Sequence, residues 1–452
     1  MKNLSRRSFL TKASALTAGA LILPSQINYL RGSNLNDKIN VAVIGVGGQG
    51  RGNLRDCKNE NVVALCDVSE IAAADSFKSY PQARRFKDFR VMFDKMANEI
   101  DAVIVCTPDH THFPAAIAAM QLGKHICVEK PLAHNVWQLR TLRKAAKKYN
   151  VISQMANQGH ATMGIRYVKE WYDAGVLGNV REVLAWFDGP EFNERGYFLK
   201  PDSYPPKGET IPEGIDWDLW LGPAAYRPYS RFYMPRFWRG WYELGNGELG
   251  DWACHTLDAP FWALDLGMPV SVDSVSRTPS PEGYVSDQSI LKFEFKARGN
   301  KPPVTLTWYE GGLKPYNRKE FGLPELPSQG MIMIGDKVSL MTGGRPNDPK
   351  LLLPEADWQN FLKNRPAEVI PRVEGGPRAE WFAAIKGTGP MPGSNFEYSA
   401  RLTEMSLLGV MAQRFNTRIE YDEANMKVTN HPNFDVYIKE PVRKGWEFGE
   451  DV

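Results

Sequence analysis

Short apolar runs alternate with amphipathic segments over the first third of the chain. Five runs are typical of strands buried on both faces: Ile39–Val46, Asn61–Cys66, Ile100–Cys106, His125–Val128 and Val151–Met155. The segments between them have helical spacing: Gly50–Cys57, Ser69–Lys78, Val91–Ala97, Pro114–Leu122 and Val136–Lys148. Strands that alternate with helices predict βαβ units, and therefore an N-terminal α/β domain with a doubly wound parallel sheet at 34–157.

A different pattern begins after residue 157. Six further segments predict strands: Arg181–Phe187, Ser271–Arg277, Gln288–Phe295, Val304–Trp308, Met331–Ile334 and Lys337–Met341. Three segments predict helices: Met163–Ala174, Glu380–Ile385 and Ser399–Phe415. Gly335-Asp336 predicts a hairpin-like turn, and residues 189–250 predict long ordered loops. We therefore expect an α+β domain at 158–452, with a large, mainly antiparallel open sheet and helices on one face.

The first 33 residues have the layout of an export signal. A charged segment with adjacent Arg6 and Arg7 precedes the apolar run Ala13–Leu23, which is short for a membrane span. The arginine pair followed by Phe-Leu resembles a twin-arginine signal. We therefore set residues 1–33 apart from the fold. We expect the export machinery to act on the chain, leaving it periplasmic or anchored in the membrane facing the periplasm. The alternative is a chance Arg-Arg pair before an N-terminal helix.

Charge and cysteine content exclude other classes of protein. Part of the net charge of +3 comes from the basic N-terminus, so the remaining chain is near neutral and has no basic footprint for nucleic acid. The five cysteines contain no CxxC pair and their spacing suggests no pairing. A structural zinc site is therefore not expected, and neither is a disulfide framework.

A glycine loop follows the first strand. It matches G-x-G-x-x-G with Gly45-Val46-Gly47-Gly48-Gln49-Gly50. Such glycines allow a tight turn, close approach of a pyrophosphate and close helix–strand packing, while N–H groups at the helix start face the anion. Asp67 ends the second strand, where a carboxylate binds both ribose hydroxyls and repels a 2′-phosphate. The pattern predicts a Rossmann fold that binds NAD in preference to NADP; the alternative is a glycine turn without a cofactor.

Two more motifs follow later strands of the same sheet. Thr107-Pro108 comes after the strand at 100–106, with His112 close behind, and Glu129-Lys130-Pro131 comes after the strand at 125–128. Strand-Thr-Pro, a nearby histidine and Glu-Lys-Pro are shared marks of the Gfo/Idh/MocA oxidoreductases. In order and spacing, the chain resembles this family over roughly residues 39–420.

The resemblance implies a group of residues around the nicotinamide and the substrate. Lys130 is implied to contact the substrate, and Thr107, Pro108 and His112 to lie near the nicotinamide. We also expect Glu129 to bind the cofactor, and Asn157-Gln158, which follows the fifth strand, to line the same pocket. From the residues alone, Lys130 lies at the carboxyl end of a parallel strand, where open α/β sheets bind ligands, and a lysine there can polarise a hydroxyl or carbonyl oxygen. The alternative is a surface lysine paired with Glu129.

A second concentration of polar residues lies at 247–255. Asp251 and His255 are four residues apart, so a helix places them on one face. The family carries Asp-x-x-x-His here, which implies His255 as the acid/base and Asp251 as its orienting partner and substrate contact. Two alternatives remain: Asp251 caps the helix, or it binds a metal with His255 and Asp258, although no third segment supplies a ligand. We expect Pro260 to bend or end this helix.

The region around this motif is rich in aromatic residues. Residues 215–262 hold Trp217, Trp220, Trp238, Trp241, Trp252, Trp262, Tyr226, Tyr229, Tyr233 and Tyr242. These rings either pack the long loop or stack on the C–H faces of a sugar. Arg231, Arg236 and Arg239 are candidates for binding hydroxyls or carboxylates.

These features predict hydride transfer at a hydroxyl of a sugar, polyol or glycoside. His255 removes the proton, Lys130 steadies the oxygen and NAD takes the hydride. Export leaves no obvious pool of NAD, so the alternatives are exchange of hydride between two sugars and a redox-neutral NAD-dependent glycosidase with tightly bound cofactor. A further alternative is a non-catalytic nucleotide- or sugar-binding protein, against which the intact Lys130, Asp251 and His255 argue. The resemblance also implies a homo-oligomer that packs through the open sheet face.

Overall fold

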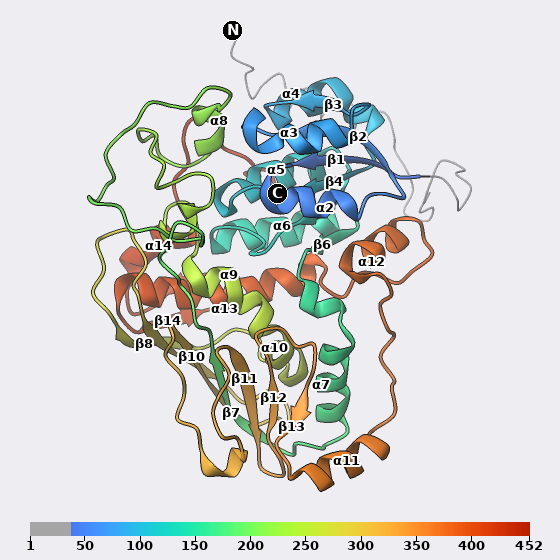
Figure 1. Ribbon diagram of the computed structural model, residues 1–452, viewed down its shortest axis with the longest axis vertical. Helices are drawn as coiled ribbons and strands as arrows, with labels where there is room; N and C mark the ends of the chain where they lie inside the picture. The colour runs from blue at the N-terminus through green and yellow to red at the C-terminus, as the bar shows by residue number, and fades with distance from the viewer. Residues whose placement is uncertain (1–37) are drawn as a thin grey trace.

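A computed structural model of the protein describes residues 38–452. The export signal predicted at 1–33 lies outside the described residues. Figure 1 shows two sheets with helices between them, one sheet built from the N-terminal part of the chain and one from the C-terminal part. Within residues 38–452, no helix combines the length and the apolarity needed to cross a bilayer.

The first sheet has six parallel strands in the order β3-β2-β1-β4-β5-β6. They are β1 (Asn40–Ile44), β2 (Asn61–Cys66), β3 (Arg84–Phe86), β4 (Ala102–Val105), β5 (His125–Val128) and β6 (Ser153–Met155). The winding reverses between β1 and β4, which creates the switch point where open α/β sheets bind ligands. The five predicted strands are confirmed. β3 was not predicted, because Arg84 and Arg85 stand where an apolar run would be expected.

Five helices connect these strands: α2 (Gly48–Arg55), α3 (Glu70–Ser79), α4 (Phe89–Met96), α5 (Asp109–Gln121) and α6 (Val136–Lys148). The side chains of Ser69, Asp88 and Asn135 accept hydrogen bonds from the first turns of α3, α4 and α6 and so fix where these helices begin. α5 begins at Asp109 instead of the predicted Pro114. The prediction was late because the first turn of α5 is polar in sequence, although the structure buries it.

The second sheet has nine strands in the order β13-β12-β11-β7-β10-β9-β8-β14-β15. They are β7 (Val180–Trp186), β8 (Ser271–Arg277), β9 (Ser289–Phe295), β10 (Val304–Glu310), β11 (Gly330–Gly335), β12 (Leu340–Thr342), β13 (Lys350–Leu351), β14 (Ile419–Asp422) and β15 (Lys427–Val428). Neighbours run antiparallel except β7 and β10. The six predicted strands and the hairpin between β11 and β12 are confirmed. The strands that were not predicted are short and lie at the two ends of the sheet.

Helix α13 (Phe396–Phe415) lies between the two sheets (Figure 1). It contacts α6 on one side, and on the other α9 (Gly247–Thr256) and strands β8 and β9. Its residues are buried nearly all round, as expected for a helix in a core. Arg140 of α6 donates to Glu404 of α13 through Nε at 3.0 Å and Nη2 at 2.5 Å. This bidentate pair fixes α13 against the Rossmann domain.

Two shorter helices complete the layer on this face of the second sheet: α7 (Met163–Asp173) and α10 (Asp258–Leu264). α9 ends at Thr256 because Pro260 has no N–H to donate to the Thr256 carbonyl. Pro260 therefore ends α9, as expected, and lies in the first turn of α10. The opposite face of the sheet is partly covered by Phe321 and Leu326, which pack near Trp186.

Segments from the C-terminal part of the chain return to the Rossmann domain. α12 (Gly376–Ile385) buries Trp381 and Phe382 in the core formed by β1, β2 and β4. Trp381 Nε1 donates to the Ile152 carbonyl at 3.2 Å. Near the C-terminus, Trp446 packs edge-on against Phe89 of α4, with ring centroids 6.1 Å apart. The core around the parallel sheet therefore contains side chains from both halves of the chain.

Gly50 offers a test of the close packing between α2 and β1. A Cβ on Gly50 would lie 1.8 Å from the Gly45 carbonyl oxygen, so one backbone must move. We expect Gly50→Ala to lower the free energy of unfolding by about 2 kcal/mol in guanidinium denaturation. Gly52→Ala is the matched control, because its nearest atom is the flexible Gln49 side chain at 4.0 Å; it should be neutral or slightly stabilising. Equal losses in the two variants would contradict the packing argument.

Candidate active site

The loop between β1 and α2 has the backbone geometry of an anion cradle. Gly45 has φ of +81°, and a Cβ there would lie 2.7 Å from the Cys106 carbonyl oxygen. A Cβ on Gly47 would press against α3. Gly48 and Gln49 are exposed at the start of α2, which has no side-chain cap. Since first-turn N–H groups have no partner within a helix, they are directed at a ligand in front of the loop.

Asp67 lies across this loop at the end of β2. One carboxylate oxygen accepts from the N–H of Val46 at 2.8 Å and of Gly47 at 3.0 Å, and the other accepts from the N–H of Ser69 at 2.9 Å. Burial raises the pKa of Asp67, and these three hydrogen bonds counteract the rise. The carboxylate is therefore held where the adenosine ribose of a dinucleotide is expected.

The C-terminal domain is hydrogen-bonded to the segments that flank the glycine loop on both sides. Two main-chain hydrogen bonds of 2.9 Å each join residues 68–70 to residues 214–216. On the other side, His110 in the first turn of α5 has its ring nitrogens 3.1 Å from the Leu244 carbonyl oxygen and 3.0 Å from that of Trp220. The long loop thus contacts the segments that follow β2 and β4.

Two buried polar atoms at the carboxyl edge of the parallel sheet have no hydrogen-bond partner among residues 38–452. They are Thr107 Oγ1, which follows β4, and Gln158 Oε1, which opens the short 3-10 helix η2 (Gln158–Ala161) after β6. Pro108 lies next to Thr107 and directly precedes α5. A buried polar atom without a partner costs free energy, so both positions fit a ligand that hydrogen-bonds there. With the glycine cradle and Asp67, these residues fit a dinucleotide.

His112 and Glu129 hold neighbouring loops in place. The two ring nitrogens of His112 each lie 2.8 Å from a carbonyl oxygen, one in the loop after β4 and one in the loop after β5. Burial lowers the pKa of His112. Glu129 accepts from Asn53 Nδ2 at 2.7 Å and lies 3.9 Å from Arg378 Nη1. These two predicted cofactor-site residues therefore position the loops, and their polar atoms contact the protein.

Lys130 joins the two domains at the cleft. Its Nζ donates to Asp251 Oδ1 at 2.7 Å and to the Asp251 carbonyl oxygen at 3.0 Å. Arg239 Nε donates to the same Oδ1 at 3.3 Å. Burial would raise the pKa of Asp251, but the charges of Lys130 and Arg239 outweigh it and hold this pKa well below its usual range. An ammonium has three N–H donors, so Lys130 keeps one for a ligand oxygen.

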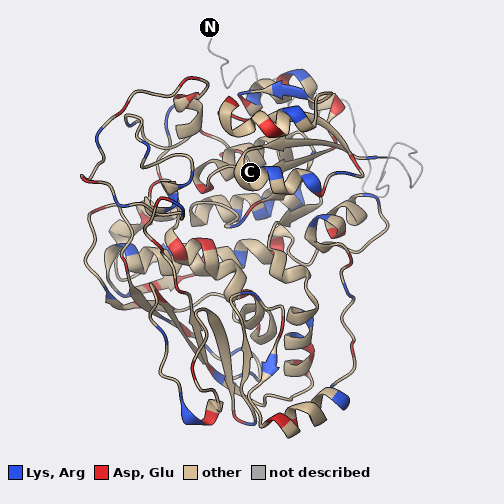
Figure 2. Cartoon of the chain, viewed as in Figure 1, with Lys and Arg blue, Asp and Glu red and all other residues tan. Residues whose placement is uncertain are grey.

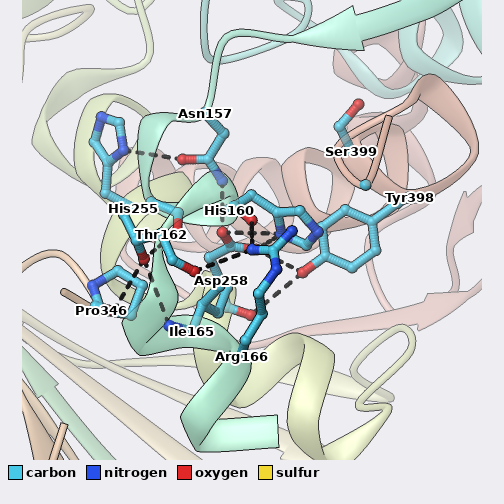
Figure 3. A network of polar contacts seen from close by, with 12 residues as sticks. Asn157, His160, Thr162, Ile165, Arg166, His255, Asp258, Pro346, Tyr398 and Ser399 are labelled. Atoms are coloured by element: carbon cyan, nitrogen blue, oxygen red, sulfur yellow. Dashed lines mark hydrogen bonds and ion pairs between the residues drawn. The ribbon is translucent and has the colours of Figure 1, made fainter. Parts of the chain in front are cut away.

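Asn157 orients His255 (Figure 3). Asn157 Nδ2 donates to Asp258 Oδ2 at 2.9 Å, which leaves Asn157 Oδ1 facing His255 Nδ1 at 3.0 Å. Because an amide oxygen only accepts, Nδ1 carries the proton and Nε2 carries the lone pair. Among residues 38–452, Nε2 has no hydrogen-bond partner. Asp251 was predicted in this orienting role, but in the structure its carboxylate pairs with Lys130 instead.

The surroundings keep His255 neutral. Burial lowers its pKa well below the usual value, and the charges of Lys130 and Arg345 lower it further, while Asp251 opposes them. The ring is 1% exposed. A neutral imidazole with one fixed N–H is ready to accept a proton at its other nitrogen.

Asp258 anchors the far end of the network in Figure 3. Its carboxylate accepts from Asn157, from His160 Nδ1 at 3.0 Å and from the Tyr398 hydroxyl at 2.6 Å. Burial, and next the charge of Asp258, raises the pKa of Tyr398 well above its usual value. Asp258 is therefore hydrogen-bonded to groups other than Asp251, with which it was grouped in the alternative metal site. In the described part of the chain, no three His, Cys, Asp or Glu side chains come together as a metal site.

Glu248 lies on the same face of α9 as Asp251 and His255, at the spacing i, i+3 and i+7. It is 5% exposed, and its carboxyl lies against Gly189, where a Cβ would come within 2.7 Å of Glu248 Cδ. Burial raises the pKa of Glu248 well above its usual value, and Asp251 adds to the rise. The shift favours the protonated carboxyl, which can both donate and accept a hydrogen bond.

Most of the aromatic residues noted in the sequence pack the long loop. The buried ones are Trp217, Trp220, Trp238, Trp241, Tyr229, Tyr233 and Tyr242. Trp252 differs, because it borders the site. Its ring centroid lies 4.0 Å from that of Phe187 and 5.4 Å from that of His255, and the Arg345 guanidinium carbon lies 4.6 Å from it. Of the three candidate arginines, Arg239 reaches Asp251.

The sequence matches two known protein families. Residues 39–157 match an oxidoreductase family with an NAD-binding Rossmann fold, and residues 163–288 match the C-terminal alpha/beta domain of the same oxidoreductases. The chain belongs to the Gfo/Idh/MocA oxidoreductase family. The predicted family, fold class and cofactor are therefore confirmed: residues 39–157 form this family's NAD-binding Rossmann domain.

Individual Gfo/Idh/MocA relatives are distant. Levoglucosan dehydrogenase of Pseudarthrobacter phenanthrenivorans is 28% identical over 47% of this chain and 46% of the relative. Alpha-N-acetylgalactosaminidase of Shewanella oneidensis is 28% identical over 35% of this chain and 41% of the relative. The chain thus spans less than half the length of either. The WlbA dehydrogenase of Chromobacterium violaceum shares the fold, with a TM-score of 0.59 and 15% identity over 89% of this chain and 99% of the other.

Several residues of the site were missed or left without a role in the sequence. Glu248 was visible from its spacing to Asp251 and His255 on one helix face. His160 and Tyr398 gave no signal, because they reach Asp258 only through the fold. Arg345 follows two glycines in a turn, a context that predicts an ordinary solvated loop.

The orientation of His255 can be tested without an activity assay. We expect its ring to stay neutral in the Nδ1–H form from about pH 6 to 8, read from side-chain 15N shifts and assigned with His255→Gln. Asn157→Leu removes the acceptor and should lose this preference. Asn179→Leu, at an exposed amide that donates to Asp336, is the control and should leave it intact. A His255 that titrates near pH 6.5, or an unchanged tautomer in Asn157→Leu, would show the assignment to be wrong.

Proposed function

We propose that the protein is an NAD-dependent oxidoreductase that transfers hydride at a hydroxyl-bearing carbon of a sugar, polyol or glycoside. The fixed tautomer of His255 carries this proposal: a neutral imidazole with an unpaired Nε2, in the same site as the Lys130 ammonium at the edge of the NAD-binding sheet. NAD, when bound, supplies the hydride acceptor.

Four side chains of the site have separate parts in the proposed reaction. Oxidation of a carbinol carbon also releases the hydroxyl proton, and His255 Nε2 accepts it. The third N–H of Lys130 donates to the same oxygen and stabilises the negative charge that develops there. Asp251 pairs with Lys130 and fixes the position of its ammonium group. Asn157 Oδ1 accepts from His255 Nδ1 both before and after the transfer, so the ring does not have to turn.

The relatives support the choice of substrate class. Levoglucosan dehydrogenase acts, by its name, on an anhydrosugar, and the WlbA dehydrogenase was crystallised with NADH and UDP-GlcNAcA. The carboxyl of Glu248 and the indole of Trp252 are suited to hydroxyl and C–H groups of a sugar ring.

The proposal is tested by releasing nucleotide from the purified protein with denaturant and identifying it by absorbance and mass. A panel of sugars and polyols is then assayed for NADH formation. Substrate-dependent reduction of bound or added NAD supports the proposal. A protein that neither carries nor binds NAD or NADP would contradict it.

Two substitutions in the site should remove turnover and keep the cofactor. We expect His255→Asn and Lys130→Met each to lower kcat by roughly 10²- to 10⁴-fold, the usual contribution of a proton-transfer group, with the NAD content unchanged. Lys147→Met is the control, because this lysine pairs with Glu397 on the surface, 69% exposed. A His255→Asn variant that retains turnover would exclude His255 as the base.

A second candidate is a redox-neutral glycosidase that oxidises its sugar transiently and returns the hydride. The similarity to an alpha-N-acetylgalactosaminidase favours it, as does the long loop that is hydrogen-bonded to the segments on both sides of the glycine loop. The export signal predicted from the sequence would also suit a cofactor that stays bound. Release of the aglycone from aryl glycosides without net NADH formation would identify this activity, and NADH that accumulates with product would exclude it.

A further inference from the structure

Arg345 is a cation at the site whose side chain has neither a hydrogen bond nor an ion pair with any residue in the range 38–452. It lies in the loop 343–347, which follows β12. Its guanidinium carbon lies 4.6 Å from the ring centroid of Trp252, the indole that borders His255. The residue is exposed, so its N–H donors remain available to a ligand.

The loop that carries Arg345 is held by a hydrogen bond on each side of this residue. Thr256, which follows His255 in α9, donates from Oγ1 to the Gly344 carbonyl at 2.9 Å. Thr162 donates from Oγ1 to the Pro346 carbonyl at 3.2 Å, a contact drawn beside the His255 network in Figure 3. The main chain on either side of Arg345 is therefore tied to the elements that hold the candidate base.

The carboxylates of the site have hydrogen-bond partners other than Arg345. Asp251 already pairs with both Lys130 and Arg239, and burial raises the pKa of Glu248 well above its usual value. Burial raises the pKa of Asp109 to about 6, so its charge is present at pH 7, where it accepts from an amide. Figure 2 shows basic and acidic residues interspersed over both domains.

The charge of Arg345 acts on the groups of the site. It lowers the pKa of His255, and Asp251 is the carboxylate that acts back on Arg345. NAD, when bound in its oxidised form, would bring the further positive charge of its nicotinamide ring to the site, a charge that hydride transfer then removes. An anionic ligand at Arg345 would offset both, whereas a neutral one would leave the guanidinium without a partner.

We propose that Arg345 binds a carboxylate of the substrate, and that the substrate is therefore a sugar acid. The inference rests on the proposed function, which places the reacting hydroxyl between Lys130 and His255. Trp252 stacks on Phe187, and the planar guanidinium that lies over its indole presents paired N–H donors to the carboxylate.

The test compares sugars that differ only in the oxidation state of C6. The NAD-loaded protein is given glucose and glucuronate, galactose and galacturonate, and mannose and mannuronate. Binding is measured by calorimetry and turnover by NADH absorbance. We expect at least one uronate to exceed its neutral twin by roughly 10- to 100-fold in affinity or kcat/KM, the size of a charge-assisted hydrogen-bonded pair.

Substitutions at Arg345 should remove this preference. Arg345→Gln should bring the preferred uronate down to its neutral twin mainly through KM, and Arg345→Lys should keep part of the preference because the charge remains. Arg365→Gln is the matched control: this exposed arginine also lies over an aromatic ring, with its guanidinium carbon 4.8 Å from the Tyr167 centroid, and it should change neither value. Equal melting temperatures show that the variants are folded.

The outcomes separate this inference from the proposed function. Turnover of a neutral sugar that equals or exceeds that of its uronate, unchanged in Arg345→Gln, overturns the inference and keeps the oxidoreductase. Uronate binding that depends on Arg345, with no hydride transfer, keeps the inference and overturns the proposed reaction. If no uronate binds more tightly than its twin, the inference is overturned as well.

Discussion

The ion pair between Lys130 and Asp251 is the contact on which the site depends. Lys130 follows a strand of the parallel sheet, and Asp251 lies on a helix of the second domain. A charge removed from water requires a partner, so neither domain can present its half of the site alone. The pair also decides what else is possible nearby. Because Asp251 serves two cations, the imidazole of His255 takes a neutral partner in Asn157.

That neutral partner extends into a buried network with a single carboxylate at its centre. Asp258 receives hydrogen bonds from an amide, an imidazole and a phenol, all on elements other than its own helix. Each donor restricts the others, so the orientation of His255 follows from packing several residues away. The candidate site thus combines a half held by an ion pair, Lys130 with Asp251, and a half in which the imidazole of His255 is paired with an amide.

The sequence predicted those features that have a local cause. Strands of the parallel sheet are buried on both faces, and their apolar runs are visible one by one, whereas β3 carries Arg84 and Arg85 and was missed. Lys130 and His255 could be predicted because family motifs surround them. The contact of His255 with Asn157 joins residues 98 positions apart, and Arg345 comes to the cleft only through pairing of β11 with β12. Contacts between residues so far apart in the chain leave no pattern in the local sequence from which they could be predicted.

The hydrogen bonds of the long loop 189–250 to the segments after β2 and β4 limit how the two domains can move. Enzymes that open and close by a hinge motion rotate one domain about a few residues. Here such a rotation would break the main-chain bonds at residues 68–70 and the bonds of the His110 ring together. A rotation of this kind is therefore opposed on both sides of the glycine loop, and motions of side chains and short loops disturb fewer of these contacts.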